Sequence, residues 1–148
     1  MKEINFPNDI DTWLSEGNNP AYSEYLTGQR EEINHFFEDL GIPLDSEIAH
    51  FYRHYGASSF RGWYGLNDLD QFEDMIDYSK EELGVSEDYL PLSSIEGEGV
   101  TFYQKCTGAV FDVEFGQFEA FEKGELAPIA KSFVGFLSWA KQEDESGS

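Results

Sequence analysis

Residues 33–56 read INHFFEDLGIPLDSEIAHFYRHYG and predict two short amphipathic helices joined by a tight corner. Gly41 and Pro43 end the first helix, because glycine adopts positive φ and proline cannot continue the helix. Asp45 or Ser46 can cap the second helix. Each helix has apolar side chains at the i, i+3, i+4, i+7 spacing of one face: Ile33, Phe36, Phe37 and Leu40, then Ile48, Phe51, Tyr52 and Tyr55. These two aromatic faces must bury against a third element.

The chain of 148 residues is long enough to bury a core, and residues 1–148 are predicted to form a single domain. Residues 1–28 are expected to be a loosely attached leader with one short helix, whose apolar side carries Ile10, Trp13 and Leu14. The first helix of the pair is expected to have Glu31 and Glu32 in its first turn. The polar tail, residues 142–148, is expected to fray.

Cysteine usage and apolar runs indicate the compartment. The single cysteine, Cys106, excludes an intramolecular disulfide. The N-terminus lacks the apolar segment of a signal peptide. No apolar run approaches the roughly 20 residues that span a bilayer. We therefore expect a cytoplasmic protein.

Charge is the most unusual property of the chain. It contains 30 acidic and 9 basic residues, for a net charge of −21. Such a field repels nucleic acid and anionic membranes and attracts cationic partners. An acidic surface also serves solubility or adaptation to salt, so charge alone does not identify a partner. The partners expected from charge are basic proteins, with neither nucleic acid nor membrane.

The pattern changes period after Gly56. Residues 59–66 are aromatic and interrupted by glycine, which predicts a strand. A helix capped by Asn67 or Asp68 follows and ends at Gly84. This helix is the most acidic segment of the chain, and its apolar side carries Leu69, Phe72, Met75, Ile76 and Leu83.

Residues 89–115 predict a β-meander. Strands are expected at 89–95, 100–105 and 109–115, with turns at 97–99 and 106–108. Alternation in the last strand places Phe111, Val113 and Phe115 on the core face and Val110, Asp112 and Glu114 on the other. Residues 116–124 are expected to be a loop or another short strand.

A closing helix is expected to begin near Ala130 or Ser132. Its apolar face carries Phe133, Phe136, Leu137 and Ala140. Helices followed by strands and a final helix predict an α+β fold. We expect an antiparallel β-meander sheet covered on one face by the N-terminal helix pair and the C-terminal helix.

Two clusters of metal-ligand residue types do not match metal sites. His50 and His54 stand at i and i+4, but zinc sites need three or four ligands and no third is placed. The acidic residues from Asp68 onward depart from the calcium loop, which needs a ligand at position 5 and glycine at position 6, where Phe72 and Glu73 stand. We expect no metal and no cofactor.

The sequence also favours a protein that is not an enzyme. Cys106 lies in a predicted turn, with Lys105 as its one basic neighbour, which favours a plain thiol over a nucleophile. Gly97-Glu98-Gly99 is too short and too acidic to cradle a phosphate. No pair of catalytic carboxylates can be chosen from thirty.

Several motifs recur in an order that resembles the SUKH superfamily, the Smi/Knr-type proteins. Residues 33–44 and 48–56 resemble its opening helix, Leu-Gly ending, corner and Tyr-Gly step. Residues 90–99 look like its Leu-Pro strand and Gly-acid turn, and 107–112 look like its hairpin. Residues 129–137 are similar to its closing Ser-Phe-x-x-Phe-Leu helix. The ordered set covers about residues 29–140.

The resemblance implies an α+β fold with a meandering sheet and no catalysis. Many bacterial members are immunity proteins, which bind and neutralise a cognate polymorphic toxin, often a nuclease. The expected function is therefore stoichiometric occlusion of the basic C-terminal domain of such a toxin. Two alternatives stay open: an acidic mimic of nucleic acid, and an intracellular regulatory scaffold. The protein is expected to be a monomer or weak dimer.

Residues that combine acid with accessible aromatic side chains are the candidate contacts, because interface hot spots favour Trp and Tyr and fast capture favours charge. The alternatives are core packing for the aromatic residues and a solvated helix face for the acids. Glu96 and Glu98, in a turn, are weaker candidates. The predicted partner-binding residues are Trp63, Tyr64, Asp70, Glu73, Asp74, Asp77, Tyr103, Asp112 and Glu114.

Overall fold

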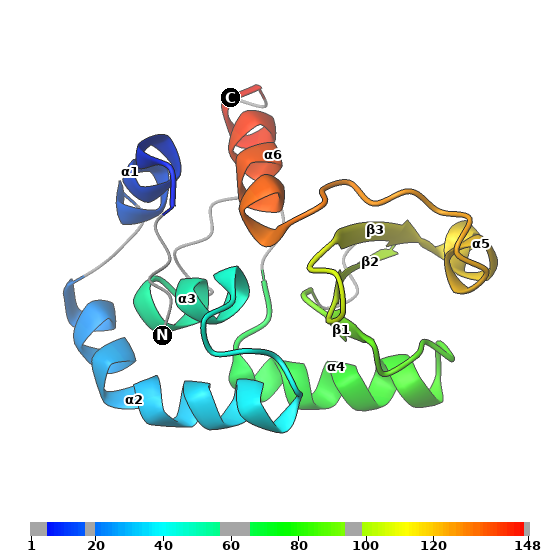
Figure 1. Cartoon of the computed structure of the whole chain (residues 1–148), viewed down its shortest axis with the longest axis horizontal. Helices are drawn as coiled ribbons and strands as arrows, with labels where there is room; N and C mark the ends of the chain where they lie inside the picture. The colour runs from blue at the N-terminus through cyan, green and yellow to red at the C-terminus, as the bar shows by residue number, and fades with distance from the viewer. Residues whose placement is uncertain (1–5, 17–19, 57–65, 94–98, 147–148) are drawn as a thin grey trace. The chain divides into compact units, whose positions relative to one another are not determined.

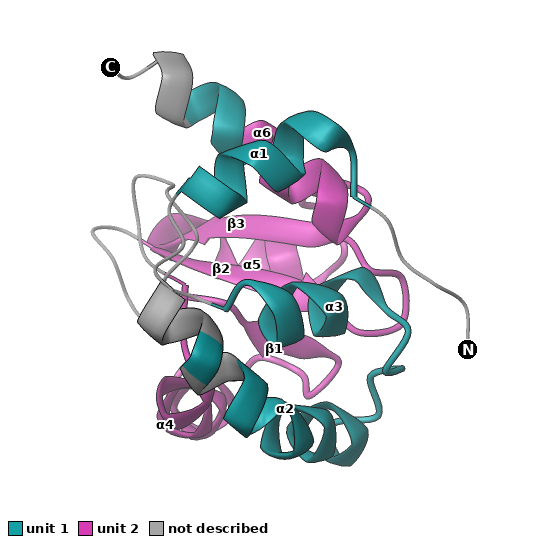
Figure 2. Ribbon diagram, turned by 90° about the vertical axis from the view of Figure 1, so that its left-hand side faces the viewer, with its two compact units in different colours: residues 1–65, 140–148 teal, residues 66–139 magenta. Residues whose placement is uncertain are grey.

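The computed structural model describes residues 6–16, 20–56, 66–93 and 99–146. Two compact units divide the chain, shown in teal and magenta in Figure 2. Unit 1 contains Met1–Gly65 and Ala140–Ser148, and unit 2 contains Leu66–Trp139. The described residues form helices and one three-stranded antiparallel sheet, which confirms the α+β class. The single domain over residues 1–148 stays a prediction.

Unit 1 begins with helices α1 (Asn8–Glu16), α2 (Pro20–Asp39) and α3 (Glu47–His54). The corner between α2 and α3 forms as predicted, with Gly41 at a φ of +76°. Ser46 caps α3, since its Oγ accepts a hydrogen bond of 3.3 Å from the backbone N–H of Ala49. The pair meets through Phe37 and Tyr52, whose ring centroids lie 5.7 Å apart. The buried side chains of the pair and its corner are Ile33, Phe37, Ile42, Ile48, Ala49, Phe51 and Tyr52.

The N-terminal segment is packed into unit 1. Helix α1 forms as predicted and buries Ile10, Trp13 and Leu14. The hydroxyl of Tyr55, which follows α3, donates a hydrogen bond to the carboxylate of Asp11 in α1. Phe6 packs edge to face on His50, with ring centroids 4.8 Å apart. These contacts tie the described part of residues 1–28 to the helix pair.

Helix α2 begins earlier than the sequence indicates. The expectation that Glu31 and Glu32 lie in its first turn is wrong, because α2 starts at Pro20. Proline suits the first position of a helix, where its missing N–H group has no partner to lose. Gly28 then lies inside the helix, where glycine is unfavourable. That glycine and the polar residues around it conceal the first two turns in the sequence pattern.

Gly28→Ala should raise the free energy of unfolding by about 0.5–1 kcal/mol, because alanine favours a helix interior. A Cβ atom on Gly28 would meet no other atom within 4 Å. Urea denaturation followed by circular dichroism measures the change. Gly99→Ala is the opposite control, because its Cβ would lie 2.2 Å from the carbonyl oxygen of Val113 and should destabilise the sheet. No gain from Gly28→Ala would contradict the long α2.

Unit 2 contains the sheet, and Figure 1 shows helix α4 (Leu69–Glu81) beside β1 and helix α5 (Phe118–Glu122) at the end of β3. Its strands are β1 (Tyr89–Pro91), β2 (Gly99–Gln104) and β3 (Val110–Glu114), in the order β1-β2-β3. Phe102 pairs with Phe111 across β2 and β3. The predicted meander and its hairpin are confirmed, with Gly108 in the turn at a φ of +82°.

Both faces of the sheet are covered within unit 2. One face contributes Val100, Phe102, Phe111 and Val113 to a cluster that also contains Met75 of α4 and Phe121 of α5. On the other face, Tyr103 packs edge to face on Phe133 of α6 (Phe133–Ser146), with ring centroids 6.2 Å apart. Covering both faces buries Val110 and Tyr103 as well, to 0% and 5% exposure.

Three local expectations differ from the structure. Phe115 is 47% exposed and not on the core face, because β3 ends at Glu114 and a 3-10 helix, η2 (Phe115–Gln117), breaks the alternation. Residues 118–122 form helix α5 in place of a loop or strand. Strand β1 ends at Pro91, at the edge of the sheet, where proline removes no ladder bond. The strand predicted at 59–66 lies, apart from Leu66, outside the described residues.

The closing helix agrees closely with the sequence pattern. Ser132 caps α6 by accepting a hydrogen bond of 3.0 Å from the backbone N–H of Gly135. The helix continues through Ser146, so most of the tail expected to fray is helical. Its predicted apolar face is buried at all four positions, Phe133, Phe136, Leu137 and Ala140.

Candidate functional site

Helix α4 carries four of the nine predicted contact residues, more than any other element that the structure describes. Its first turn is held by a reciprocal pair of hydrogen bonds between Asp68 and Gln71, each 3.0 Å long, in which each side chain accepts from the other's backbone N–H. The helix buries Phe72, Met75 and Ser79. Because one side is fixed against the sheet cluster, the opposite side is turned to solvent.

The exposed side of α4 is a continuous acidic face. We define this acidic face as Asp70, Glu73, Asp74, Asp77 and Glu81, all of which are exposed. Their spacing of three or four residues aligns them along the helix. At a rise of about 1.5 Å per residue, the face is roughly 16 Å long. The structure therefore brings together four of the nine predicted contact residues.

Tyr78 lies beside this acidic face and is not among the contact residues predicted from the sequence. The side chain of Tyr78 is 37% exposed. Among the residues that the structure describes, Tyr78 and Phe115 are the two large hydrophobic residues that are exposed. Tyr78 follows Asp74 by four residues and is therefore its neighbour on the helix. This spacing could have identified Tyr78 from the sequence, because it places the tyrosine on the acidic side of the helix and not on the apolar side.

The basic residue of α4, Lys80, forms its ion pair with a residue outside the acidic face. The ammonium nitrogen of Lys80 lies 2.5 Å from Oε1 of Glu87, which follows the helix in the chain. The hydrogen bond to Glu87 raises the pKa of Lys80, and the same bond lowers the pKa of Glu87. Lys80 therefore forms its ion pair outside the acidic face, and the charges of Asp77 and Glu81 also raise its pKa.

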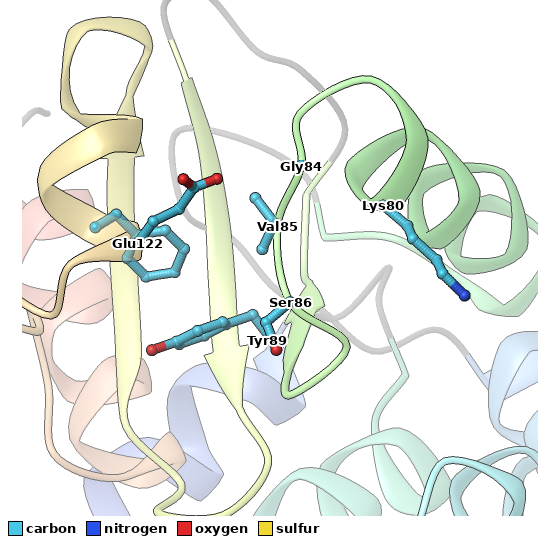
Figure 3. Close-up of a pocket in the computed structure, with 7 residues that line it drawn as sticks. Lys80, Gly84, Val85, Ser86, Tyr89 and Glu122 are labelled. Atoms are coloured by element: carbon cyan, nitrogen blue, oxygen red, sulfur yellow. The ribbon is translucent and has the colours of Figure 1, made fainter.

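A hollow of about 320 Å³ opens at the C-terminal end of α4. We call it the α4–α5 hollow, and Figure 3 shows the residues that line it. Its apolar wall comes from Val85, Tyr89 and Phe121, and Glu122 of α5 stands at its edge. Gly84, at a φ of +67°, turns the chain from α4 toward β1 and so shapes this side. All of these residues belong to unit 2.

The hairpin residues do not join α4. Tyr103 is buried against Phe133, so its expected place on a polar face is wrong: the sheet has no polar face at this position. Asp112 lies on the same side of the sheet as Tyr103. It pairs with Thr101, which is two residues from Tyr103 on β2 and therefore points to the same side. That side is opposite to the cluster containing Met75 of α4. Glu114 is exposed at the end of β3.

Asp112 is half-buried, and its burial has an electrostatic consequence. Burial raises the pKa of Asp112, and the nearby charge of Glu114 raises it further. The folded protein therefore binds this proton more tightly than the unfolded chain does. Its contribution to stability falls as the pH rises from the ordinary Asp pKa through the raised value.

Asp112→Asn should therefore be more stable than the parent at pH 7, and the difference should shrink as the pH falls below the ordinary pKa of aspartate. Urea denaturation from pH 3 to pH 8 measures both proteins. Glu125→Gln, which removes an exposed charge from the same unit, controls for the relief of general repulsion. Equal pH dependence in the two variants would contradict a specific cost at Asp112.

Trp63 and Tyr64, the two predicted aromatic contacts, lie outside the described residues.

Among the residues that the structure describes, no group of three or more His, Cys, Asp and Glu side chains could hold a metal ion. The rings of His50 and His54 are 4.4 Å apart. Burial lowers the pKa of both histidines, and the charge of Arg53 lowers both further. The charge of His50 also lowers the pKa of His54.

Cys106 lies in the hairpin turn and is exposed. Its Sγ atom is 3.3 Å from Oδ2 of Asp88. The hydrogen bond to Asp88 raises the pKa of the Cys106 thiol, and desolvation adds to this. A thiol with a raised pKa is a poor nucleophile at neutral pH.

Within the described ranges, no helix has the length and apolar character needed to cross a bilayer.

Comparison with known proteins gives one family match. The model of the SMI1 / KNR4 family (SUKH-1) matches residues 28–139. This range agrees with the 29–140 over which the motifs resemble the SUKH superfamily. Comparisons with curated proteins and with solved structures gave no match. The match covers most of the chain, including the helix pair, α4, the sheet and the start of α6, and the chain therefore belongs to the SMI1 / KNR4 family (SUKH-1).

Proposed function

We propose that this chain is a non-enzymatic immunity protein that binds and neutralises a cognate polymorphic toxin domain. The observation that carries the proposal is the acidic face of α4, exposed on a SUKH-1 chain of net charge −21. The toxin domain would be basic and of the nuclease type. The immunity protein would act in the cytoplasm as a monomer or weak dimer.

Charge and exposure support this function together. Nucleases bind phosphate backbones with basic surfaces, so an acidic helix competes for the same surface. Complementary fields also speed encounter, toward about 10⁸–10⁹ M⁻¹s⁻¹ at low salt. Lys80 forms its ion pair with Glu87 and not with a carboxylate of the acidic face. Covering the nuclease surface needs no catalytic group, only a complex with one copy of each protein.

Tyr78 supplies the kind of anchor that charge alone lacks. Interface energy concentrates in a few aromatic and arginine residues, whereas exposed ion pairs contribute little. Tyr78 is partly exposed beside Asp74 and Asp77. We assign the rate of capture to the acidic face and much of the lifetime of the complex to Tyr78. Asp112 and Glu114 lie across the sheet and form at most a separate contact.

The decisive experiment pairs the chain with the toxin domain encoded beside its gene. A catalytically inactive toxin domain is mixed with the chain, and light scattering after gel filtration gives the stoichiometry. We expect a one-to-one complex, and the active toxin should lose its activity at one equivalent. No complex, or inhibition far below one equivalent, would overturn occlusion.

Two further arms separate the alternatives. An acidic mimic of nucleic acid would also displace DNA from several unrelated DNA-binding proteins, whereas an immunity protein should bind its cognate domain selectively. A regulatory scaffold would retain host proteins in a pull-down without any toxin. Broad displacement of DNA, or host partners with no toxin binding, would replace the proposal.

A further inference from the structure

The α4–α5 hollow combines an aromatic wall with a carboxylate at its edge. Tyr89 and Phe121 form the wall, with ring centroids 4.4 Å apart, and Val85 completes it. Tyr89 is half-buried, so part of its ring remains available. The volume of about 320 Å³ is at the small end of ligand sites, which suits one inserted side chain more than a larger ligand.

Glu122 is directed toward the hollow. Figure 3 shows its carboxylate pointing from α5 toward Gly84 and Val85. Its Oε1 atom lies 3.5 Å from the position that a Cβ atom would take on Gly84. Among the described residues, Glu122 has no ion pair or hydrogen bond through its side chain. The nearest lysine along the chain, Lys123, lies 2.9 Å from Glu119 and is therefore engaged.

Lys80 also lines the hollow but does not fill it. Figure 3 shows its ammonium group pointing away from Val85 and Tyr89. The ion pair of Lys80 with Glu87 holds it there. The charge that faces the hollow is therefore negative, in a chain that is itself strongly acidic.

We propose that the α4–α5 hollow is a subsite for one arginine side chain of the basic partner. A guanidinium is planar, so it can stack on the ring of Tyr89 while its N–H groups donate to the carboxylate of Glu122. Its aliphatic stem matches Val85 and Phe121. Lysine fits less well, because a compact, strongly hydrated ammonium offers no flat face. The assignment rests on the proposed function only in naming a protein as the source of this arginine.

A second hollow of unit 2 provides a contrast. It has a volume of about 440 Å³ and shares Tyr89 and Phe121, but its charged lining residue is Lys131. It therefore has the aromatic wall without the carboxylate. The arginine subsite is assigned to the α4–α5 hollow because Glu122 lines this hollow and does not line the second one. The location at the end of α4 places it beside the acidic face, where a partner drawn by charge arrives.

The test uses the full chain labelled with ¹⁵N and a single-residue probe, N-acetyl-arginine amide. At physiological salt we expect saturable shifts in the amide signals of Gly84, Val85 and Glu122. N-acetyl-citrulline amide is neutral and nearly isosteric, and N-acetyl-lysine amide carries the same charge. Both should bind at least about tenfold more weakly than the arginine probe, because each lacks either the charge or the planar fork.

Matched variants locate the binding group. Glu122→Gln should weaken the arginine probe by about tenfold or more, the factor that corresponds to one charge-assisted hydrogen bond. Glu125→Gln removes the same charge from an exposed residue outside the hollow and should leave binding unchanged. Equal response to arginine and lysine probes would indicate general attraction to an acidic protein and overturn the subsite. So would equal binding by the two variants.

The outcomes also separate this inference from the proposed function. Binding of the arginine probe without capture of any toxin domain would retain the subsite and reject the immunity function. Capture of a toxin domain that Glu122→Gln does not weaken, with no response to the arginine probe, would reject the subsite alone.

Discussion

Phe51→Ala should lower the free energy of unfolding by about 3–5 kcal/mol, the cost of removing a fully buried phenylalanine. Phe51 is 0% exposed in α3, and its ring centroid lies 5.2 Å from that of Tyr52. Truncation therefore leaves a cavity beside the ring of Tyr52 and removes this stacked contact. Urea denaturation followed by circular dichroism at 222 nm measures the loss.

Phe36→Ala provides the matched comparison. The sequence spacing assigns Phe36 and Phe51 the same role, but the structure leaves Phe36 only half-buried. Its loss should stay below about 2 kcal/mol, because less apolar surface leaves the core. Phe51→Leu, which keeps most of the volume, should cost less than Phe51→Ala. Equal losses for the two alanine variants would mean that the burial of the helix pair is wrong.

Reversing Glu73, Asp74 and Asp77 to lysine should slow association with the cognate toxin domain by about tenfold or more. Electrostatic steering accounts for factors of about 10 to 10³ in association rates, and these three residues are the centre of the acidic face. The association rate should also lose most of its dependence on salt. Stopped-flow measurements at several salt concentrations test both effects.

The control reverses Glu32, Glu38 and Asp39, three exposed acidic residues of α2. This variant changes the net charge of the chain by the same amount but leaves α4 intact. We expect a much smaller change in association rate. If both triple variants slow capture equally, the overall charge drives encounter and α4 is not the contact. Circular dichroism establishes that both variants keep their helices.

Some of the candidate site could be predicted from local pattern. The acidic face follows from residue spacing on one helix, and the same spacing predicts the position of Tyr78 beside it. The ion pair of Lys80 could not be predicted, because Glu87 lies beyond the turn at Gly84. The direction of the Glu122 side chain could not be predicted either. Residues 118–122 show no strong helical period, and the turn at Gly84 that Glu122 faces is distant in the sequence.

The sequence by itself determined the helix pair of residues 33–56, a cap at Asp45 or Ser46, the order of the strands and the apolar face of α6. These features depend on spacing, caps and turns within a few residues. Only the tertiary structure decided that Tyr103 is core and Phe115 is not. Burial of Tyr103 depends on Phe133, thirty positions away, and exposure of Phe115 depends on where β3 stops pairing. A strand with both faces covered loses the alternation that marks its core side, because cover comes from distant segments that a local pattern does not contain.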